Sequence, residues 1–289
     1  MSSAPKVTIG ISFRNPGRYY FSLALKSVFA QTFTDWELIL MDDGSSDDSL
    51  ALARSIKDPR VRVYSDGLNK RMNIRFNELV GLARAPYLFR MDADDIMHPE
   101  RLERQYAELV RCDSDTVIGC NAYSIDANSN IVGLRYLPAA APALLDAPFI
   151  HPSVAAATEW FRRHPYSESF AYHRAQDVEL WCRTACSSTF VNLHEALLYY
   201  REAGVFSYEN YIGSQLGLLF LLRTRFSRPR TRYTATLLKI IVKLFLVSLY
   251  DTADNADKIV ARRYQRLTPD QRQQAEAALA RVLSCPLPT

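Results

Sequence analysis

Short apolar stretches of strand length alternate with longer segments of helical apolar spacing along the first half of the chain. The strand-like stretches are Val7–Phe13, Trp36–Asp42, Val61–Ser65, Tyr87–Met91 and Thr116–Ser124. The helix-like segments are Tyr20–Gln31, Ser46–Ile56, Met72–Ala83 and Pro99–Val110. Strands that alternate with helices usually pair in parallel and are covered by the helices. The pattern therefore predicts an α/β fold with a Rossmann-like, mostly parallel sheet that has helices on both faces.

The second half of the chain continues with a helix-like segment at Asp177–Thr184 and a strand-like one at Leu197–Arg201. From Phe206 onward the apolar spacing is helical, and no further strand–helix–strand unit follows. We therefore expect one large domain followed by a helical C-terminal tail. The predicted boundaries are 1–205 for the domain, with halves at about 1–125 and 126–205, and 206–289 for the tail.

Two acidic clusters follow two of the predicted strands. Asp42-Asp43-Gly44-Ser45 closes one apolar run, and Asp92-Ala93-Asp94-Asp95 closes another. Ligands of parallel α/β sheets bind beyond the carboxyl ends of the strands, so these carboxylates should meet in one crevice. Clustered carboxylates repel one another unless a cation neutralises them, and Mg²⁺ or Mn²⁺ prefers such oxygen ligands together with a diphosphate. The alternatives are a turn that caps a helix for the first cluster and a solvated loop for the second.

Composition narrows the class of protein. The chain has 289 residues, of which 48% are hydrophobic and 23% are charged, and this balance is typical of a globular protein. A net charge of +4 is too small to indicate a nucleic-acid partner. The five cysteines are sparse and odd in number, which favours reduced thiols. With no signal-like N-terminus and no apolar run of ~20 residues, we expect a cytoplasmic protein without a membrane-spanning helix.

Over roughly Val7 to Arg201 the chain resembles the inverting family 2 glycosyltransferases of the GT-A fold. Five motifs in the family's order carry the resemblance: Val7–Asn15, Ser27–Leu38, Asp42–Asp47, Asp92–Asp94 and Pro99–Leu102. The resemblance implies a nucleotide-sugar donor, with UDP as the expected nucleotide, bound in the first half of the domain with Mn²⁺ or Mg²⁺. It implies a glycan or lipid-linked acceptor in the second half and a role in cell-surface polysaccharide synthesis.

The resemblance assigns the donor-binding roles residue by residue. Asp43 corresponds to the aspartate that contacts the nucleotide base, and Asp42 would support it. Phe13 and Asn15 would border the base and the ribose. Arg75 stands where the family often places a basic residue toward the nucleotide, although a surface arginine on the helix is an equal alternative.

The Asp92-Ala93-Asp94 segment resembles the DXD motif that holds the metal and the diphosphate. Asp94 would be the principal metal ligand, and Asp92 would contact the ribose or a metal-bound water. Two positions depart from the family pattern elsewhere: Ser12 replaces a common proline, and Arg71 replaces a common glycine.

The segment Gln176–Arg183 resembles the family's Glu-Asp motif at a helix start. Asp177 matches the catalytic base, because inversion at an anomeric carbon needs one group to take the proton of the acceptor hydroxyl. The alternative is an aspartate favoured only by the helix dipole. Gln176 departs from the family's usual glutamate. His151, Gln176 and Trp181 are expected on the acceptor side, although a structural role for His151 is the more common one for a lone histidine.

The tail contains the segment Leu237–Tyr250, which is apolar on nearly every side and follows a stretch with five arginines between 223 and 232. It is too short to span a bilayer. One interpretation is a helix buried against the domain or against a second copy of the chain. The other is an interfacial helix, with residues 223–250 making a peripheral contact with anionic lipid at the inner face of the cell membrane.

Two other functions fit part of these observations. A catalytically weak nucleotide-sugar-binding protein would explain the departures at Arg71 and Gln176. A nucleotidyltransferase would use a similar crevice but would release pyrophosphate. A receiver domain of the response-regulator type also holds Mg²⁺ at strand ends, but the chain length and the Asp177 motif argue against it.

Overall fold

A computed structural model describes residues 4–137, 147–172, 174–203, 207–225, 234–242 and 263–289. Its strands are β1 (Val7–Phe13), β2 (Trp36–Asp42), β3 (Val61–Tyr64), β4 (Tyr87–Met91), β5 (Ile96–Met97), β6 (Thr116–Asp126), β7 (Ile131–Arg135), β8 (Ala155–Ala157) and β9 (Thr189–Ala203). Its helices are α1 (Arg18–Phe29), α2 (Ser49–Ser55), α3 (Met72–Leu82), α4 (Arg101–Leu109), α5 (Thr158–Arg163), α6 (Gln176–Thr184), α7 (Tyr208–Arg225) and α10 (Pro269–Ser284), with short 3₁₀ turns η1 (His151–Ser153) and η2 (Phe170–Tyr172).

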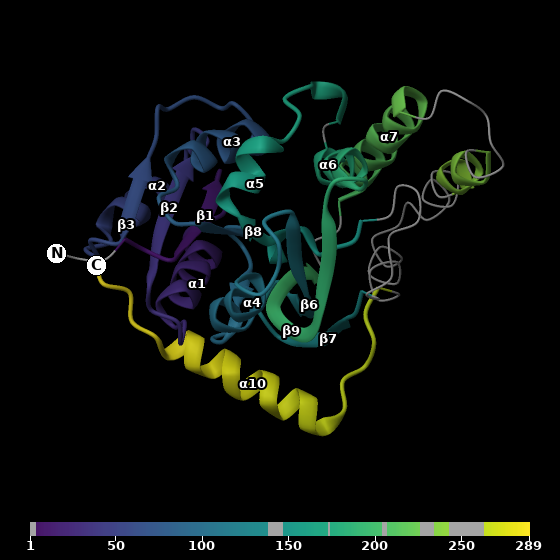
Figure 1. The fold of residues 1–289 in the computed structure, drawn as a ribbon. Coiled ribbons are helices and arrows are strands. Elements are labelled where there is room, and N and C mark those ends of the chain that lie inside the picture. The colour runs from purple at the N-terminus through teal and green to yellow at the C-terminus, as the bar shows by residue number, and fades with distance from the viewer. Residues whose placement is uncertain (1–3, 138–146, 173, 204–206, 226–233, 243–262) are drawn as a thin grey trace.

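The described strands form one nine-stranded sheet in the order β3-β2-β1-β4-β8-β6-β9-β5, with β7 paired to β6. The strands β3, β2, β1 and β4 are parallel, with Val7 opposite both Trp36 and Tyr87. Beyond β4 the sheet is mixed: β8 is antiparallel to β4 and β6, whereas β6 and β9 are parallel. The predicted parallel arrangement therefore describes the first half of the domain, and a curled, mixed sheet completes the second (Figure 1).

Helices cover both faces of the parallel strands, which explains why β1 and β2 are apolar almost throughout. On one face α1, α2 and α4 pack against residues such as Ile9 and Leu38. On the other face α3, α5 and α6 enclose a core rich in aromatic side chains. Gly10 in β1 allows α3 to lie close, because a Cβ atom there would meet the side chain of Leu79 at 2.6 Å.

The C-terminal segments lie in two places. The helix α7 packs with the helical residues 234–242 through a small core that includes Leu221, Leu222 and Ile240. The helix α10 instead crosses the base of the molecule and packs on α1 (Figure 1), and after it the carbonyl of Pro288 accepts a hydrogen bond from the N–H of Lys57, just beyond α2. Residues 243–250 of the predicted apolar tail helix lie outside the described residues, and the predicted boundary at residue 205 stays a prediction.

None of the helices in the described ranges combines the length and the apolar character needed to cross a bilayer. The five cysteines all lie in the described residues, and none of them is part of a disulfide there.

Candidate active site

The strands β1, β2 and β4 end at one edge of the sheet, and a cavity of about 480 Å³ lies beyond them. We call it the strand-end cavity. Five residues that the sequence singled out line it together: Phe13, Asn15, Asp43, Asp92 and Asp94. Asp42 and Arg75 do not line it. They instead hold Asp43 and its loop in position, through the contacts described next.

Asp43 is held by a dense set of donors behind the strand-end cavity. Its carboxylate accepts hydrogen bonds from the backbone N–H groups of Lys70 (2.6 Å) and Arg71 (3.1 Å) and from Nε of Arg75 (3.1 Å). The residue is only 4% exposed. Its orientation is therefore fixed before any ligand binds.

Arg75 is buried, not on the surface as one interpretation of the sequence had it. Its side chain is 2% exposed and forms ion pairs with Asp43, Asp66 and Glu78. It also donates a hydrogen bond to the carbonyl of Leu68. Because these partners come from three different segments, Arg75 ties the loop after β3 to the end of β2 and orients Asp43.

Asp42 and Asn15 shape the loop that carries Asp43. Asp42 accepts hydrogen bonds from the N–H of Ser45 (3.0 Å) and from the hydroxyl of Ser65 (2.7 Å). The side-chain oxygen of Asn15 accepts one from the N–H of Ser46 at 2.7 Å. Asn15 adopts a φ of 48°, a left-handed conformation that asparagine tolerates better than most residues. The first acidic cluster is thus a turn at Asp42 and a cavity-lining group at Asp43.

Asp92 and Asp94 are the carboxylates of the second cluster that face the strand-end cavity. Asp92 pairs with the buried guanidinium of Arg90 at 2.8 Å, and its side chain is 32% exposed. Burial against the surrounding protein and the negative charge of Asp92 raise the pKa of the Asp94 carboxyl to about 6. A cation near Asp94 would relieve this repulsion.

The residues present fit a divalent metal that is shared with a ligand. The described residues contain no group of three or more His, Cys, Asp or Glu side chains placed to hold a metal by themselves. Asp92 and Asp94 nevertheless suit Mn²⁺ or Mg²⁺, because such ions are commonly held by one or two carboxylates together with substrate phosphates.

Asp95, the third carboxylate of the cluster, is structural. It is 1% exposed and accepts a hydrogen bond from the N–H of Arg201 in β9 at 2.8 Å. The guanidinium of Arg201 in turn donates to the carbonyl of Asp94 at 2.8 Å. No motif in the sequence indicates this link, which joins the loop after β4 to β9.

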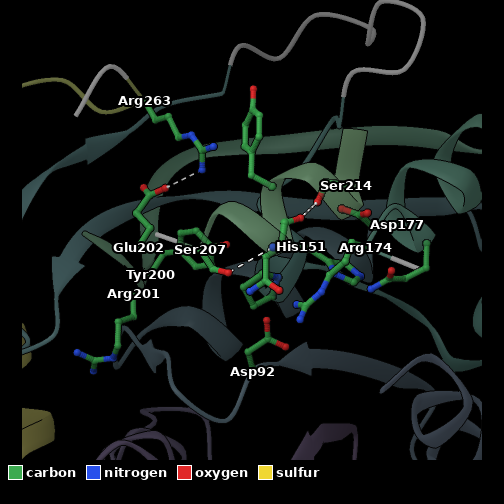
Figure 2. Close-up of a pocket in the computed structure, with 14 residues that line it drawn as sticks. Asp92, His151, Arg174, Asp177, Tyr200, Arg201, Glu202, Ser207, Ser214 and Arg263 are labelled. Carbon is green, nitrogen blue, oxygen red and sulfur yellow. Dashed lines mark hydrogen bonds and ion pairs between the residues drawn. The ribbon is translucent and has the colours of Figure 1, made fainter. Parts of the chain in front are cut away.

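Figure 2 shows a second cavity, of about 360 Å³, which we call the Asp177 cavity. Asp92 and Arg174 line both cavities. Asp177 enters from the first turn of α6, and His151 enters from η1. The acidic strand-end group and the predicted base therefore face one continuous space.

The protonation of these groups favours Asp177 as a proton acceptor. Burial raises the pKa of the Asp177 carboxyl above its usual value, and the positive charge of Arg90 limits the rise. Burial and the same Arg90 charge lower the pKa of His151 well below its usual value. The His151 ring is then neutral at pH 7, and its Nε2 lies 2.7 Å from the hydroxyl of Tyr166.

Of the two other residues expected on the acceptor side, one lines the cavity and one lies buried behind it. Gln176 lines the Asp177 cavity. Trp181 is 1% exposed and packs among Phe149, His151 and Trp160, so it supports the position of His151 from behind.

Several residues that line the Asp177 cavity escaped the sequence analysis, among them the charged residues Arg174, Glu202 and Arg263. Arg174 lies next to α6 with a positive φ of 65°. Figure 2 shows Glu202 and Arg263 at the end of the cavity opposite Arg174 and Asp177. None of the three belongs to a motif that the resemblance covers, and only their charge and the nearness of two of them to predicted elements could have drawn attention to them.

The chain is similar to known proteins in sequence and in fold. The model of the family described as glycosyl transferase family 2 matches residues 9–170. EpsE of Bacillus subtilis, a protein assigned as a glycosyltransferase, is 30% identical over 70% of this chain and 75% of its own length. WbnJ of Escherichia coli, an O-antigen biosynthesis glycosyltransferase, is 27% identical over 63% of this chain and 74% of its own length.

Two solved structures share the fold. Residues 1–349 of Staphylococcus aureus TarS in complex with UDP superpose with a TM-score of 0.57 at 15% identity, covering 96% of this chain and 80% of that one. The mannosyltransferase PcManGT of Pyrobaculum calidifontis, in complex with GDP-Man and Mn²⁺, gives 0.59 at 12% identity, covering 98% and 87%. The sequence matches place the chain among glycosyltransferases and the superpositions confirm the expected GT-A fold, so the chain belongs to glycosyl transferase family 2.

Proposed function

We propose that this chain is an inverting, metal-dependent glycosyltransferase that moves a sugar from a UDP-linked donor to a glycan or lipid-linked acceptor in cell-surface polysaccharide synthesis. The observation that carries the proposal is the continuity of two cavities through Asp92, with Asp43 and Asp94 on one side and Asp177 on the other. The solved relatives with UDP, UDP-GlcNAc or GDP-Man support a nucleotide-sugar donor, and the O-antigen relative supports a polysaccharide pathway.

The donor lies in the strand-end cavity in this proposal. Asp43, held by Arg75, accepts a hydrogen bond from the base, and Phe13 and Asn15 border the base and the ribose. Asp94, with Asp92, would hold the divalent metal. A metal held there would supply positive charge that stabilises the leaving diphosphate.

The acceptor lies in the Asp177 cavity, with its hydroxyl toward Asp177. As that hydroxyl attacks the anomeric carbon from the face opposite the leaving diphosphate, Asp177 takes its proton. Burial raises the proton affinity of Asp177, which suits a base that must accept a proton during attack. One displacement inverts the anomeric centre, and no covalent intermediate with the protein is needed.

A thermal-shift panel of nucleotides tests the donor site. A ligand at 100 times its dissociation constant stabilises the folded state by ~2.7 kcal/mol. For a chain of this size the Tm should then rise by roughly 5–10 °C. We expect this rise with UDP in the presence of Mn²⁺ and its loss when EDTA is added. If no nucleoside diphosphate shifts the Tm in Mn²⁺, the donor site has been placed wrongly.

We also propose that the C-terminal region attaches the enzyme to an anionic membrane surface. The helix α7 exposes Ile212 (42%), Leu216 (54%) and Phe220 (41%), and residues 234–242 expose Leu238 (62%) and Ile241 (50%). Arg223 and Lys239 are exposed on the same two helices. Apolar side chains beside basic ones are typical of helices that lie in the headgroup region of anionic bilayers.

Sedimentation with vesicles tests this attachment. We expect vesicles that contain phosphatidylglycerol to retain the protein at low salt and to release it as salt rises, because screening weakens the charge attraction. The pair Leu238→Glu with Ile241→Glu should abolish retention. The matched control is Val110→Glu with Leu283→Glu, which alters exposed apolar residues outside this region. Equal retention of both double variants, or a dimer in place of vesicle binding, would contradict the attachment.

A further inference from the structure

A third cavity, of about 490 Å³, is lined by Asp177 and meets the strand-end cavity at Arg174, which lines both. We call it the basic cavity. It shares Arg174, Asp177, Ser214 and Arg263 with the Asp177 cavity. It has Asp177 and Arg174 at its edge but contains none of the predicted donor-binding aspartates. A molecule in this cavity would reach Asp177 without occupying the nucleotide site.

Three guanidinium groups line the basic cavity, from Arg135, Arg174 and Arg263. A single buried carboxylate, that of Glu202, serves two of them: it lies 2.6 Å from Arg135 and 3.9 Å from Arg263. The other oxygen of Glu202 accepts a hydrogen bond from Ser124 at 2.6 Å. Glu202 therefore fixes two of the guanidinium groups, and with Asp177 counted as well, three positive charges face two carboxylates around the cavity.

Arg174 is the third of these positive charges. Among the described residues it takes part in no ion pair, and it lies at the junction of the three cavities. Arg135 is held in place in addition by the ring of Tyr200, whose centroid lies 5.2 Å from its guanidinium carbon. Fixed guanidinium groups of this kind match the two oxygens of a phosphate or a carboxylate.

Part of the remaining wall of the basic cavity is apolar, and Ser214 and Asp177 also line it. Its wall includes Leu137, Val178 and Leu218, of which Leu218 belongs to α7. An anionic group that binds to the arginines would thus have an apolar or weakly polar part of the same molecule beside it. A free inorganic ion would make no contact with this apolar wall.

We propose that the basic cavity is an acceptor subsite for a molecule that carries a phosphate or a carboxylate, and that it presents the acceptor hydroxyl to Asp177. This proposal rests on the proposed function, whose acceptor class it narrows. The anion has two sources, the phosphate of a lipid-linked acceptor or the carboxylate of an acidic sugar. Both would use the same guanidinium groups.

Matched pairs of probes test the subsite in the presence of saturating UDP and Mg²⁺, which fill the donor site. Octyl phosphate is compared with octyl glucoside, and methyl glucuronide with methyl glucoside, by calorimetry. We expect the anionic member of one pair to bind at least about tenfold more tightly, the scale of one charge-assisted contact. The pair that shows the preference identifies the source of the anion.

The variant Arg263→Gln should remove most of this preference for the anionic probe. It should keep the fold, because Arg263 is partly exposed and its loss leaves Glu202 paired with Arg135. Arg135→Lys keeps a charge beside Glu202 and should weaken anion binding severalfold, because lysine lacks the planar fork. Arg266→Gln is the matched control, since Arg266 is exposed on the same segment and lines none of the cavities described here.

The subsite is wrong if neither anion binds at millimolar concentration, if anionic and neutral probes bind equally, or if Arg263→Gln binds the anion as tightly as Arg266→Gln does. The UDP-induced rise in Tm is measured on the same samples. If that rise persists while the anion preference is absent, only the subsite fails. If UDP does not bind at all, the proposed function fails first.

Discussion

Replacing Asp177 with asparagine is expected to lower the rate of sugar transfer by ~10²–10⁴, the usual effect of losing a general base. The amide keeps the shape of the side chain but cannot take a proton from the acceptor hydroxyl. Donor binding should persist, because Asp177 does not line the strand-end cavity. The measurement is the initial rate of nucleoside diphosphate release, together with the UDP-induced shift in Tm.

Asp270→Asn is the matched control, because Asp270 also lies in the first turn of a helix but is exposed at the start of α10. It should transfer sugar at the parental rate. If Asp177→Asn does the same, the proton goes to another group. His151 would then be tested first, by His151→Gln.

The variant Asp94→Asn should impair both binding and turnover. We expect turnover to fall by roughly 10²–10³, the scale of losing one group that stabilises developing charge. The nucleotide should also lose most of its metal dependence, so that UDP shifts the Tm equally with Mn²⁺ and with EDTA. The pattern differs from that of Asp177→Asn, which affects the rate alone.

The control for this variant is Asp113→Asn, an exposed aspartate that lines none of the cavities described here. It should keep both the metal dependence and the rate. A parental metal response in Asp94→Asn would assign the metal to other residues, and the pairing of Asp92 with Arg90 would then need to be tested by Asp92→Asn.

The sequence predicted the parallel half of the fold well, because each of those strands is buried by helices on both faces and its apolar pattern is unbroken. The second half depends on pairing between distant segments. β8 consists of three alanines, Ala155–Ala157, and it is a strand only because it lies between β4 and β6. The predicted strand Leu197–Arg201 is the last part of the longer β9, which pairs along the full length of β6.

Local rules placed the start of the helix at Pro99 too early. Pro99 is suited to a first helical turn, yet α4 begins at Arg101, and the carbonyl of Pro99 accepts a hydrogen bond from the N–H of Thr32 at 2.9 Å. The tertiary contact determines the boundary there, and the sequence around Pro99 does not contain it.

The candidate site likewise contains residues that sequence motifs predict and residues that they do not predict. Asp43, Asp92, Asp94 and Asp177 stand in motifs. The first three share a cavity because their strands end at one edge of the sheet, whereas Asp177 joins Asp92 in the second cavity from the first turn of α6. The basic residues around the acceptor side stand in no motif. Arg263 reaches Glu202 across more than 60 residues of sequence, and such an encounter depends on how the C-terminal segment folds back over β7 and β9.

The central claim is that the chain breaks the bond between a sugar and a nucleoside diphosphate. Phosphorus NMR of the protein with Mg²⁺ and a set of UDP- and GDP-sugars, with water or methyl glycosides as acceptor, tests it most directly. We predict that a nucleoside diphosphate accumulates from one donor in proportion to enzyme and that Asp177→Asn slows its release. Accumulation of pyrophosphate would indicate a nucleotidyltransferase, and binding of donors without any release would indicate a nucleotide-sugar-binding protein. Either result would contradict the account.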